Sequence, residues 1–258
     1  MNSGAVKVLS MRLFRRFICC CCLVIAAQRT VAQSPYSFNT GRELGIILPG
    51  LVFHGVGLLH EVPVDSLWRR VSTMDRADLP AFDRPAAYNW NLIAHRTSNV
   101  LLGAGIVGSL TMSLVDRPTP DMGPPLALMG ETVLLTTGLT NMVKVLVHRP
   151  RPYAYNPDVP IEVRKAREAY ISFWSGHTAT AAAMAFASAE MVQHSDAGST
   201  AKTITWTSAI TLPALIGHYR VRAGRHFPTD VIVGYLVGAG IGMAVPYIHR
   251  IGNEAEIH

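Results

Sequence analysis

Six long apolar stretches, separated by polar connectors, constrain this chain of 258 residues more than any other feature. Ala, Gly, Leu, Met and Thr dominate them. None shows the strict alternation of apolar and polar residues that is typical of a half-buried strand, so all six are predicted to be helices. The sequence therefore predicts an all-α bundle of about five to six core helices. Their ranges are 44–59, 100–115, 126–147, 178–192, 204–217 and 231–248.

The length and composition of these stretches bear on whether the bundle lies in a membrane. A span needs about 20 mostly apolar residues, a length that 126–147 and 231–248 approach, whereas 178–192 and 204–217 are short. The small residues of these two short stretches suit close packing between membrane helices, although they also suit the core of a soluble protein. The mean hydropathy of +0.25 is low for six spans. We favour a membrane-embedded bundle and keep a soluble exported protein as the alternative.

Residues 1–33 have the layout of an export signal. Basic residues precede the apolar stretch 17–27, and Thr30-Val31-Ala32 offers a small-residue cleavage site. A retained N-terminal anchor is the alternative. All four cysteines lie at 19–22, so removal of the signal would leave neither a disulfide nor a cysteine nucleophile.

The remaining chain is expected to divide into three segments without an internal repeat. Residues 34–98 would hold an N-terminal helix and a connector with one short surface helix, residues 99–250 the main helical bundle, and residues 251–258 a C-terminal tail. The net charge of +6 raises the question of nucleic-acid binding. However, the arginines are not interleaved with exposed aromatics and no nucleic-acid module is present, so nucleic acid is not expected as a partner.

Three polar clusters lie at helix ends that fall on the same side of the predicted bundle. The first runs from Lys144 to Pro152, where Lys144 lies within a helix and Arg151 just beyond its end, so both can reach one anion. Arginine offers a planar fork of donors to phosphate oxygens, and lysine a compact charge. The alternative is a basic helix end that faces water or lipid head groups. Arg149, beside the motif, is expected to be solvated.

The second cluster, Ser172 to Thr178, immediately precedes an alanine-rich helix. Gly176 lets an anion approach the free amides of the helix start. Ser175 adds a hydroxyl donor, and His177 can donate a proton to a leaving oxygen. The alternative is a serine helix cap beside a surface histidine.

The third cluster places Arg220 six positions before His226 and Asp230 four positions after it. If a helix starts near Pro228, Asp230 can accept a hydrogen bond from one ring nitrogen of His226 and leave the other free to attack phosphorus. Arg220 would then hold the equatorial oxygens of the transition state. The alternative makes Asp230 a helix-start residue and His226 an interfacial histidine.

Other polar residues rank lower. Glu131 on an apolar stretch needs a partner, and a structural pair with an arginine or lysine is expected. Arg222 and Arg225 are expected to face water or head groups. Several histidines lack a partner at an informative spacing and are expected to be structural or interfacial: His54, His60, His95, His148, His194 and His218.

Together the clusters resemble the type 2 phosphatidic acid phosphatase and vanadium haloperoxidase superfamily. Its pattern is Lys, six residues, Arg-Pro; then Pro-Ser-Gly-His; then Ser-Arg, five residues, His, three residues, Asp. The resemblance covers residues 126–248. Trp174 stands in place of the proline and Tyr219 in place of the serine, so we expect altered substrate access rather than lost catalysis. The matching positions are Lys144, Arg151, Pro152, Ser175, Gly176, His177, Arg220, His226 and Asp230.

By this resemblance, His226 would be the nucleophile that forms a phosphohistidine, Asp230 would orient it, and His177 would be the acid. No metal or cofactor is implied, and the clusters do not supply the grouped carboxylates of a Mg²⁺ or two-metal site. The implied activity is metal-independent hydrolysis of a lipid phosphate or diphosphate, with several lipid classes open. The implied phosphate cradle is Lys144, Arg151, Ser175, Gly176 and Arg220.

Three other functions stay open: a soluble periplasmic acid phosphatase of broad specificity, a vanadate-dependent haloperoxidase, and a non-catalytic protein that binds a lipid phosphate. The expected location is the membrane, with export by the signal and an active site that faces the periplasm; membrane lipids would be partners. A cleaved signal leaves the new N-terminus outside, so six spans would put the site in the cytoplasm. That conflict disappears if 44–59 does not span. The sequence does not indicate an oligomeric state.

Overall fold

A computed structural model describes residues 35–114 and 122–251 of the chain. The predicted signal with its four cysteines, and the predicted tail apart from its first residue, lie outside these ranges. Within them the regular elements are helices, together with one isolated bridge between Tyr36 and Arg250. The all-α prediction is confirmed.

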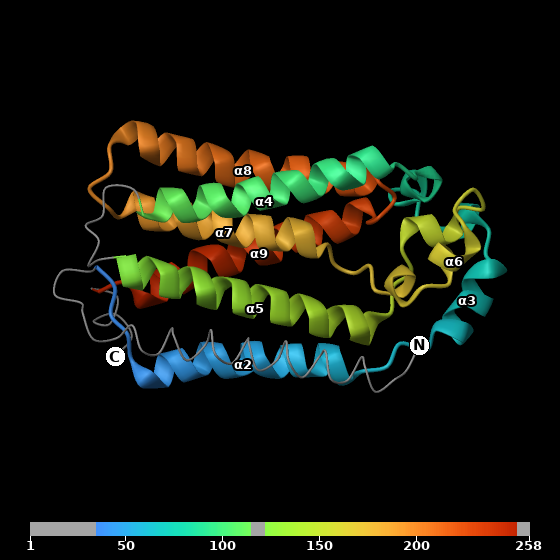
Figure 1. The fold of residues 1–258 in the computed structure, drawn as a ribbon, viewed down its shortest axis with the longest axis horizontal. Helices are drawn as coiled ribbons and strands as arrows, with labels where there is room; N and C mark the ends of the chain where they lie inside the picture. Colours follow the sequence, from blue (N-terminus) through green and yellow to red (C-terminus); the bar gives the residue numbers. More distant parts are fainter. Residues whose placement is uncertain (1–34, 115–121, 252–258) are drawn as a thin grey trace.

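Six long helices form the bundle, and each corresponds to one predicted stretch (Figure 1). Most begin or end a few residues beyond the prediction, because the polar residues in their terminal turns carry no apolar pattern. The helices are α2 (Thr40–Leu59), α4 (Leu92–Leu114), α5 (Gly123–Val147), α7 (Gly176–Gln193), α8 (Ser199–Arg222) and α9 (Pro228–His249).

The largest difference from the prediction is the start of α4. This helix begins at Leu92 rather than near residue 100, and the Asn91 side chain accepts a hydrogen bond from the Ala94 amide in its first turn (2.8 Å). The polar run from His95 to Asn99 hid these turns from a hydrophobic pattern. The connector after α2 therefore ends at Asn91, and the expected boundary between residues 98 and 99 falls inside α4.

Two connectors cover one end of the bundle. The first contains α3 (Val64–Ser72), which corresponds to the predicted short surface helix, and the 3₁₀ helices η2 (Arg76–Asp78) and η3 (Arg84–Tyr88). The second contains η5 (Pro152–Tyr155), α6 (Ile161–Arg164) and η6 (Arg167–Tyr170). They pack on each other through an apolar cluster that includes Leu67, Val71, Tyr153, Val159 and Tyr170.

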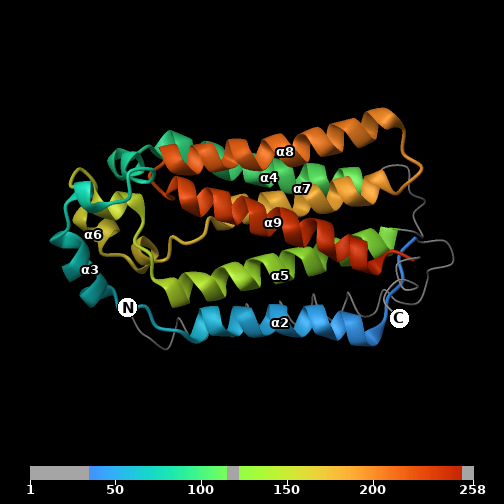
Figure 2. The same ribbon diagram turned by 180° about the vertical axis from the view of Figure 1, so that it is seen from behind.

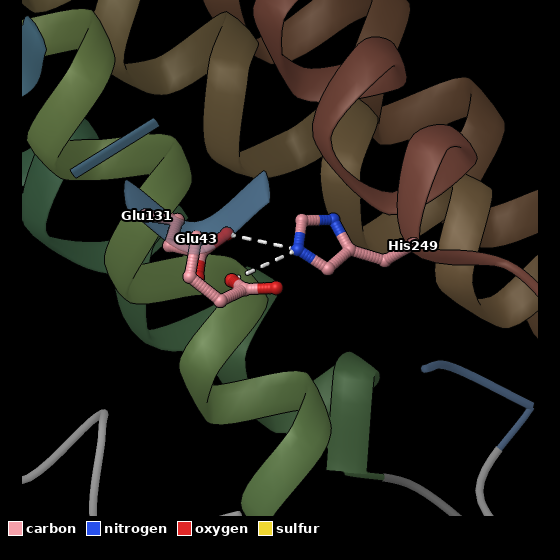
Figure 3. A group of neighbouring side chains, drawn as sticks. All are labelled: Glu43, Glu131 and His249. Carbon is pink, nitrogen blue, oxygen red and sulfur yellow. Dashed lines mark hydrogen bonds and ion pairs between the residues drawn. The ribbon is translucent and has the colours of Figure 1, made fainter. Parts of the chain in front are cut away.

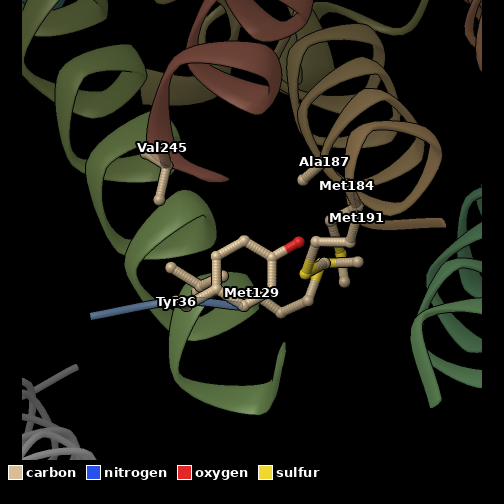
Figure 4. Close-up of a cluster of buried hydrophobic side chains, with 7 residues drawn as sticks. Tyr36, Met129, Met184, Ala187, Met191 and Val245 are labelled. Atoms are coloured by element: carbon tan, nitrogen blue, oxygen red, sulfur yellow. The ribbon is translucent and has the colours of Figure 1, made fainter. Parts of the chain in front are cut away.

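The helices run up and down, so that alternate helix ends meet. The C-terminal ends of α2, α5 and α8 and the N-terminal ends of α4, α7 and α9 lie at the end covered by the connectors (Figures 1 and 2). Tyr36 and Arg250 pair at the opposite end. Figure 4 shows Tyr36 there among Met129, Met184, Met191 and Val245, which belong to one buried apolar cluster.

Four of the described helices are long and apolar enough to cross a membrane: α2, α4, α5 with the segment that follows it to Tyr155, and α9. Large apolar side chains also face outward along the bundle, including Val52 (60% exposed), Val107 (64%) and Leu236 (63%). These are the features of a membrane helical bundle, as the sequence predicted. One of the four is α2, which contains the stretch 44–59.

The closest helix contact joins α7 and α9. Three glycines of α9, spaced four residues apart, face the backbone of α7, where small residues let membrane helices approach closely. A side-chain carbon at Gly234 would lie 2.7 Å from the Ser175 carbonyl oxygen. A side-chain carbon at Gly238 would overlap the Ala179 carbonyl oxygen, and one at Gly242 would overlap the Ala183 carbonyl oxygen.

This contact predicts that Gly238→Ala destabilises the protein by about 1–3 kcal/mol, because α9 must move away from α7. Gly240 lies on the same helix with nothing near its missing side chain. The matched control Gly240→Ala is therefore expected to be neutral or slightly stabilising. Thermal unfolding of both variants in the same detergent measures the difference, and equal melting temperatures would contradict this account.

Candidate active site

The three predicted clusters meet at the connector-covered end of the bundle, and His226 lies at their centre. Its imidazole is 1% exposed. Nε2 lies 3.3 Å from Arg151 Nη1, whereas Nδ1 faces Ser172 Oγ at 3.5 Å and Asp230 Oδ2 at 3.6 Å. One ring nitrogen thus faces cations and the other faces a carboxylate.

Asp230 occupies the first turn of α9, which begins at Pro228 as predicted. Its Oδ2 accepts hydrogen bonds from the Phe227 amide (2.9 Å) and from Ser172 Oγ (2.6 Å). The distance from Oδ2 to His226 Nδ1 is longer than a hydrogen bond, so the Ser172 hydroxyl lies between the two groups. Asp230 is therefore both a residue of the helix start and the carboxylate that faces His226, the two roles considered for it. Ser172 is a further member of the site, to which the sequence analysis gave no role.

Arg149 is not solvated as expected. Its guanidinium donates to Asp230 Oδ1 (2.5 Å) and to Asp83 Oδ2 (2.6 Å), and it lies over the Phe227 ring. Asp83, from the first connector, also accepts from the Thr229 amide (3.1 Å) and hydroxyl (2.7 Å). The prediction was wrong because Asp83 lies 66 positions away along the chain, a distance at which a sequence pattern carries no signal.

Three cations lie near His226, and one of them, Arg151, contacts Nε2. Arg151 is held by the backbone carbonyls of Glu168 (2.6 Å) and Arg225 (2.8 Å). Arg220 is 4% exposed and reaches α4. Lys144 Nζ lies close to the start of α7, since a side-chain carbon at Gly176 would be 3.8 Å from it.

One wall of the site comes from α4, which the sequence analysis did not include. His95 Nδ1 accepts from Arg220 Nη1 (2.9 Å), and Ser98 Oγ lies 3.4 Å from the same nitrogen. Asn99 Oδ1 lies 2.8 Å from His177 Nε2. His95 lies three residues before Ser98 and four before Asn99, a spacing that puts the three on one face of α4 although Arg96 and Thr97 lie between them. That spacing was the signal that could have revealed them.

The second cluster is fastened to its neighbours through Ser175 and Trp174. Ser175 caps α7, as the alternative had it, because its Oγ accepts from the Thr178 amide (3.4 Å). Its own amide donates to the Asp230 carbonyl (3.0 Å). Trp174, which stands where the resembled pattern has a proline, donates from Nε1 to Thr140 Oγ1 of α5 (2.8 Å).

Two further expectations need correction. Arg225 stacks on Trp90 and Tyr153, at 5.3 and 5.1 Å from the ring centroids, instead of facing water. Glu131 pairs with His249 (3.3 Å) rather than with an arginine or lysine. This second pair lies at the far end of the bundle from His226.

The electrostatic surroundings keep His226 neutral. Burial lowers the pKa of this imidazole well below its usual range, and the charges of Arg151, Arg220 and Lys144 lower it further. A neutral ring whose Nδ1 faces a carboxylate presents a lone pair on Nε2. The arrangement joins a nucleophilic nitrogen to a cationic pocket suited to an oxyanion.

A helical membrane bundle with these three clusters at one end is the arrangement expected from the resemblance to type 2 phosphatidic acid phosphatases. The comparison with known families agrees with that resemblance. The model of the PAP2 superfamily matches residues 125–253, half of the chain. The chain belongs to the PAP2 superfamily.

Two solved structures align with the chain. The crystal structure of Aquifex aeolicus LpxE aligns with a TM-score of 0.42 and 25% identity, covering 73% of this chain and 98% of that one. A transmembrane PAP2-type phosphatidylglycerolphosphate phosphatase from Bacillus subtilis aligns with a TM-score of 0.46 and 23% identity, covering 83% of this chain and 96% of that one. No curated protein matches the chain significantly.

The Asp83 contacts predict that Asp83→Ala destabilises the protein by about 1–3 kcal/mol, because the charged Arg149 and the Thr229 amide lose a buried partner. Asp158 is exposed in the second connector, so Asp158→Ala serves as the matched control and should unfold like the wild type. Thermal unfolding in detergent tests both, and a wild-type melting temperature for Asp83→Ala would show that the network adds nothing.

Proposed function

We propose that this protein hydrolyses a lipid phosphate or diphosphate through a phosphohistidine formed on His226. The observation that carries the proposal is the orientation of the buried imidazole. Nδ1 faces Ser172 and Asp230, while Nε2 faces Arg151. A site that only bound phosphate would not need a neutral histidine oriented by a carboxylate.

In the first step, the Nε2 lone pair attacks phosphorus and the bond from phosphorus to the leaving oxygen breaks. His177 donates a proton to that oxygen as it leaves. Asp230 and Ser172 stabilise the positive charge that develops on the ring of His226. In the second step, His177 takes a proton from a water molecule, whose oxygen attacks phosphorus. The bond from phosphorus to Nε2 breaks, its electron pair returns to Nε2, and inorganic phosphate leaves.

The phosphate cradle would consist of Lys144, Arg151 and Arg220, with the start of α7 at Ser175 and Gly176. As phosphorus becomes five-coordinate, its equatorial oxygens gain charge, which the arginines and the lysine stabilise. The free amides in the first turn of α7 add donors. Asn99 on α4 would hold His177 through Nε2 (2.8 Å) and, with His95 behind Arg220, complete the cradle from the side.

A lipid substrate is supported by the position of the site. The bundle exposes apolar side chains along helices that are long enough to cross a membrane. The site lies at the ends of these helices, which would put it at the depth of lipid head groups. A soluble acid phosphatase would expose this apolar surface to water at a high cost in free energy. We therefore favour the membrane enzyme over the soluble alternative.

We predict that His226→Ala lowers phosphate release by at least about 10³-fold, because the nucleophile is lost. The matched control is His218→Ala, since His218 is exposed on α8. Purified protein in detergent is assayed against lipid and soluble phosphomonoesters and diphosphates, and circular dichroism checks the fold. Near-normal release by His226→Ala would rule out the mechanism, and release from soluble esters alone would favour the acid phosphatase.

We also predict that turnover is resistant to EDTA and inhibited by vanadate. The three clusters use cationic side chains where other phosphatases use metal ions, and vanadate adopts the five-coordinate geometry of the transition state. Initial rates at a permissive temperature, with and without each reagent, test both parts. Rapid loss of turnover in EDTA, restored by a divalent ion, would point to a metal-dependent reaction.

The side of the membrane on which the site lies is open to a direct test. If all six helices cross, Tyr36 and His226 lie on opposite sides, so an exported N-terminus and a periplasmic site exclude each other. We retain the periplasmic site as the prediction. It requires that the chain before α2 stays in the cytoplasm.

Single cysteines introduced at either end of the bundle test on which side of the membrane the site lies. They are placed in a variant in which Cys19 to Cys22 are replaced by serine. Asp158 is exposed at the site end and Thr200 at the other end. A periplasmic site predicts that a membrane-impermeant maleimide labels Asp158→Cys in intact cells, and labels Thr200→Cys only after the cells are permeabilised. The reverse pattern would place the site in the cytoplasm.

A further inference from the structure

Three buried side chains meet at the end of the bundle opposite to His226. Glu43 comes from the first turn of α2, Glu131 from α5, and His249 from the last turn of α9; they are 5%, 1% and 0% exposed. His249 Nε2 lies 3.2 Å from Glu43 Oε2 and 3.3 Å from Glu131 Oε2. Figure 3 shows this one nitrogen facing both carboxylates. One ligand atom from each residue lies within 4.8 Å of the others.

The hydrogen bonding of His249 determines what Nε2 offers. Nδ1 lies 2.7 Å from the Val245 carbonyl oxygen. A carbonyl oxygen only accepts, so the ring hydrogen is assigned to Nδ1 and the neutral ring has its lone pair on Nε2. Histidines that bind metals are held in the same way, with the other ring nitrogen donating to a carbonyl or carboxylate.

The two carboxylates bring further lone pairs to the same point. Neither oxygen of Glu131 has a hydrogen-bond partner among the residues that the structure describes. Glu43 accepts through Oε1 from the Asn39 amide (3.2 Å), and Arg42 Nε lies 3.5 Å from the same oxygen. A buried carboxylate without a donor is costly in an apolar environment. Lone pairs of three buried side chains therefore converge on one point, and a cation bound there would be a ligand for all three.

The spacing and the chemistry of the three groups suit a divalent transition metal. Zinc bonds to histidine nitrogen and carboxylate oxygen are about 2.0–2.2 Å long, so neighbouring ligand atoms of a tetrahedral site lie about 3.3–3.5 Å apart. The two distances from His249 Nε2 are close to this separation. One imidazole with two carboxylates is a mixed donor set that Zn²⁺ or Mn²⁺ accepts, whereas Ca²⁺ and Mg²⁺ prefer oxygen alone.

We propose that Glu43, Glu131 and His249 bind a divalent transition-metal ion that fastens α2 to α5 and α9. The role is structural, because the ion would lie about 28 Å along α9 from Asp230. It would matter most for α2, which lies outside the family's matched residues 125–253. The ion would hold the beginning of α2 against the core of the bundle.

The test uses the full chain, purified in detergent through a tag without histidines from cells supplied with Zn²⁺ or Mn²⁺. Mass spectrometry of the metal content should find about one ion per chain. Glu131→Gln and His249→Gln should carry almost none. His218→Gln, with its histidine exposed on α8, is the matched control and should keep the ion.

Thermal unfolding supplies the second measurement. A chelator should lower the melting temperature of the wild type and of His218→Gln by several degrees, and the metal should restore it. Glu131→Gln should respond to neither reagent. Should that variant fail to fold, the wild type alone decides. A wild-type chain that carries no metal, and whose melting temperature is unchanged by Zn²⁺, Mn²⁺ and chelator, would overturn the proposal.

Discussion

The site depends first on how closely α7 and α9 approach each other. Gly234 faces the Ser175 backbone with no room for a side-chain carbon, and the approach lets the Ser175 amide reach the Asp230 carbonyl. That single hydrogen bond joins the start of α7 to the start of α9. His177 lies two residues beyond one partner and His226 four residues before the other, so the proposed acid and nucleophile are placed by a backbone contact rather than by their own side chains.

The charges around His226 are arranged in two layers. Asp230 is neutralised by Arg149, and Arg149 is neutralised in turn by Asp83. Neither Arg151 nor Arg220 pairs with a carboxylate in the part of the chain that the structure describes. Their positive charge therefore remains for a ligand. The carboxylate on the Nδ1 side of the ring is paired, whereas Arg151 on the Nε2 side is not paired with a carboxylate among the described residues. This difference between the two sides is what we expect of a reactive histidine rather than of a basic patch.

Much of this could be predicted from the sequence. Apolar stretches revealed the six helices, and their alternating direction brought the three clusters to one end. The prediction failed where polar residues belong to a helix, as at the start of α4, because an apolar pattern cannot register them. It also failed where partners are distant in the chain. Nothing in one sequence connects Arg149 with Asp83, or Glu131 with His249, since these pairs form only when separate helices pack.

The pairing of Tyr36 with Arg250 has a consequence for how the chain can be rearranged. The backbone there is closed by hydrogen bonds from the Ser37 amide to the His249 carbonyl (2.8 Å) and from the Ile251 amide to the Pro35 carbonyl (2.9 Å). Because the two ends of the described chain are adjacent, a short linker can join them and new ends can be opened in a connector. The bundle is therefore suited to circular permutation, with reporters attached near Tyr36 and Arg250 at the end of the bundle opposite to the proposed phosphate cradle.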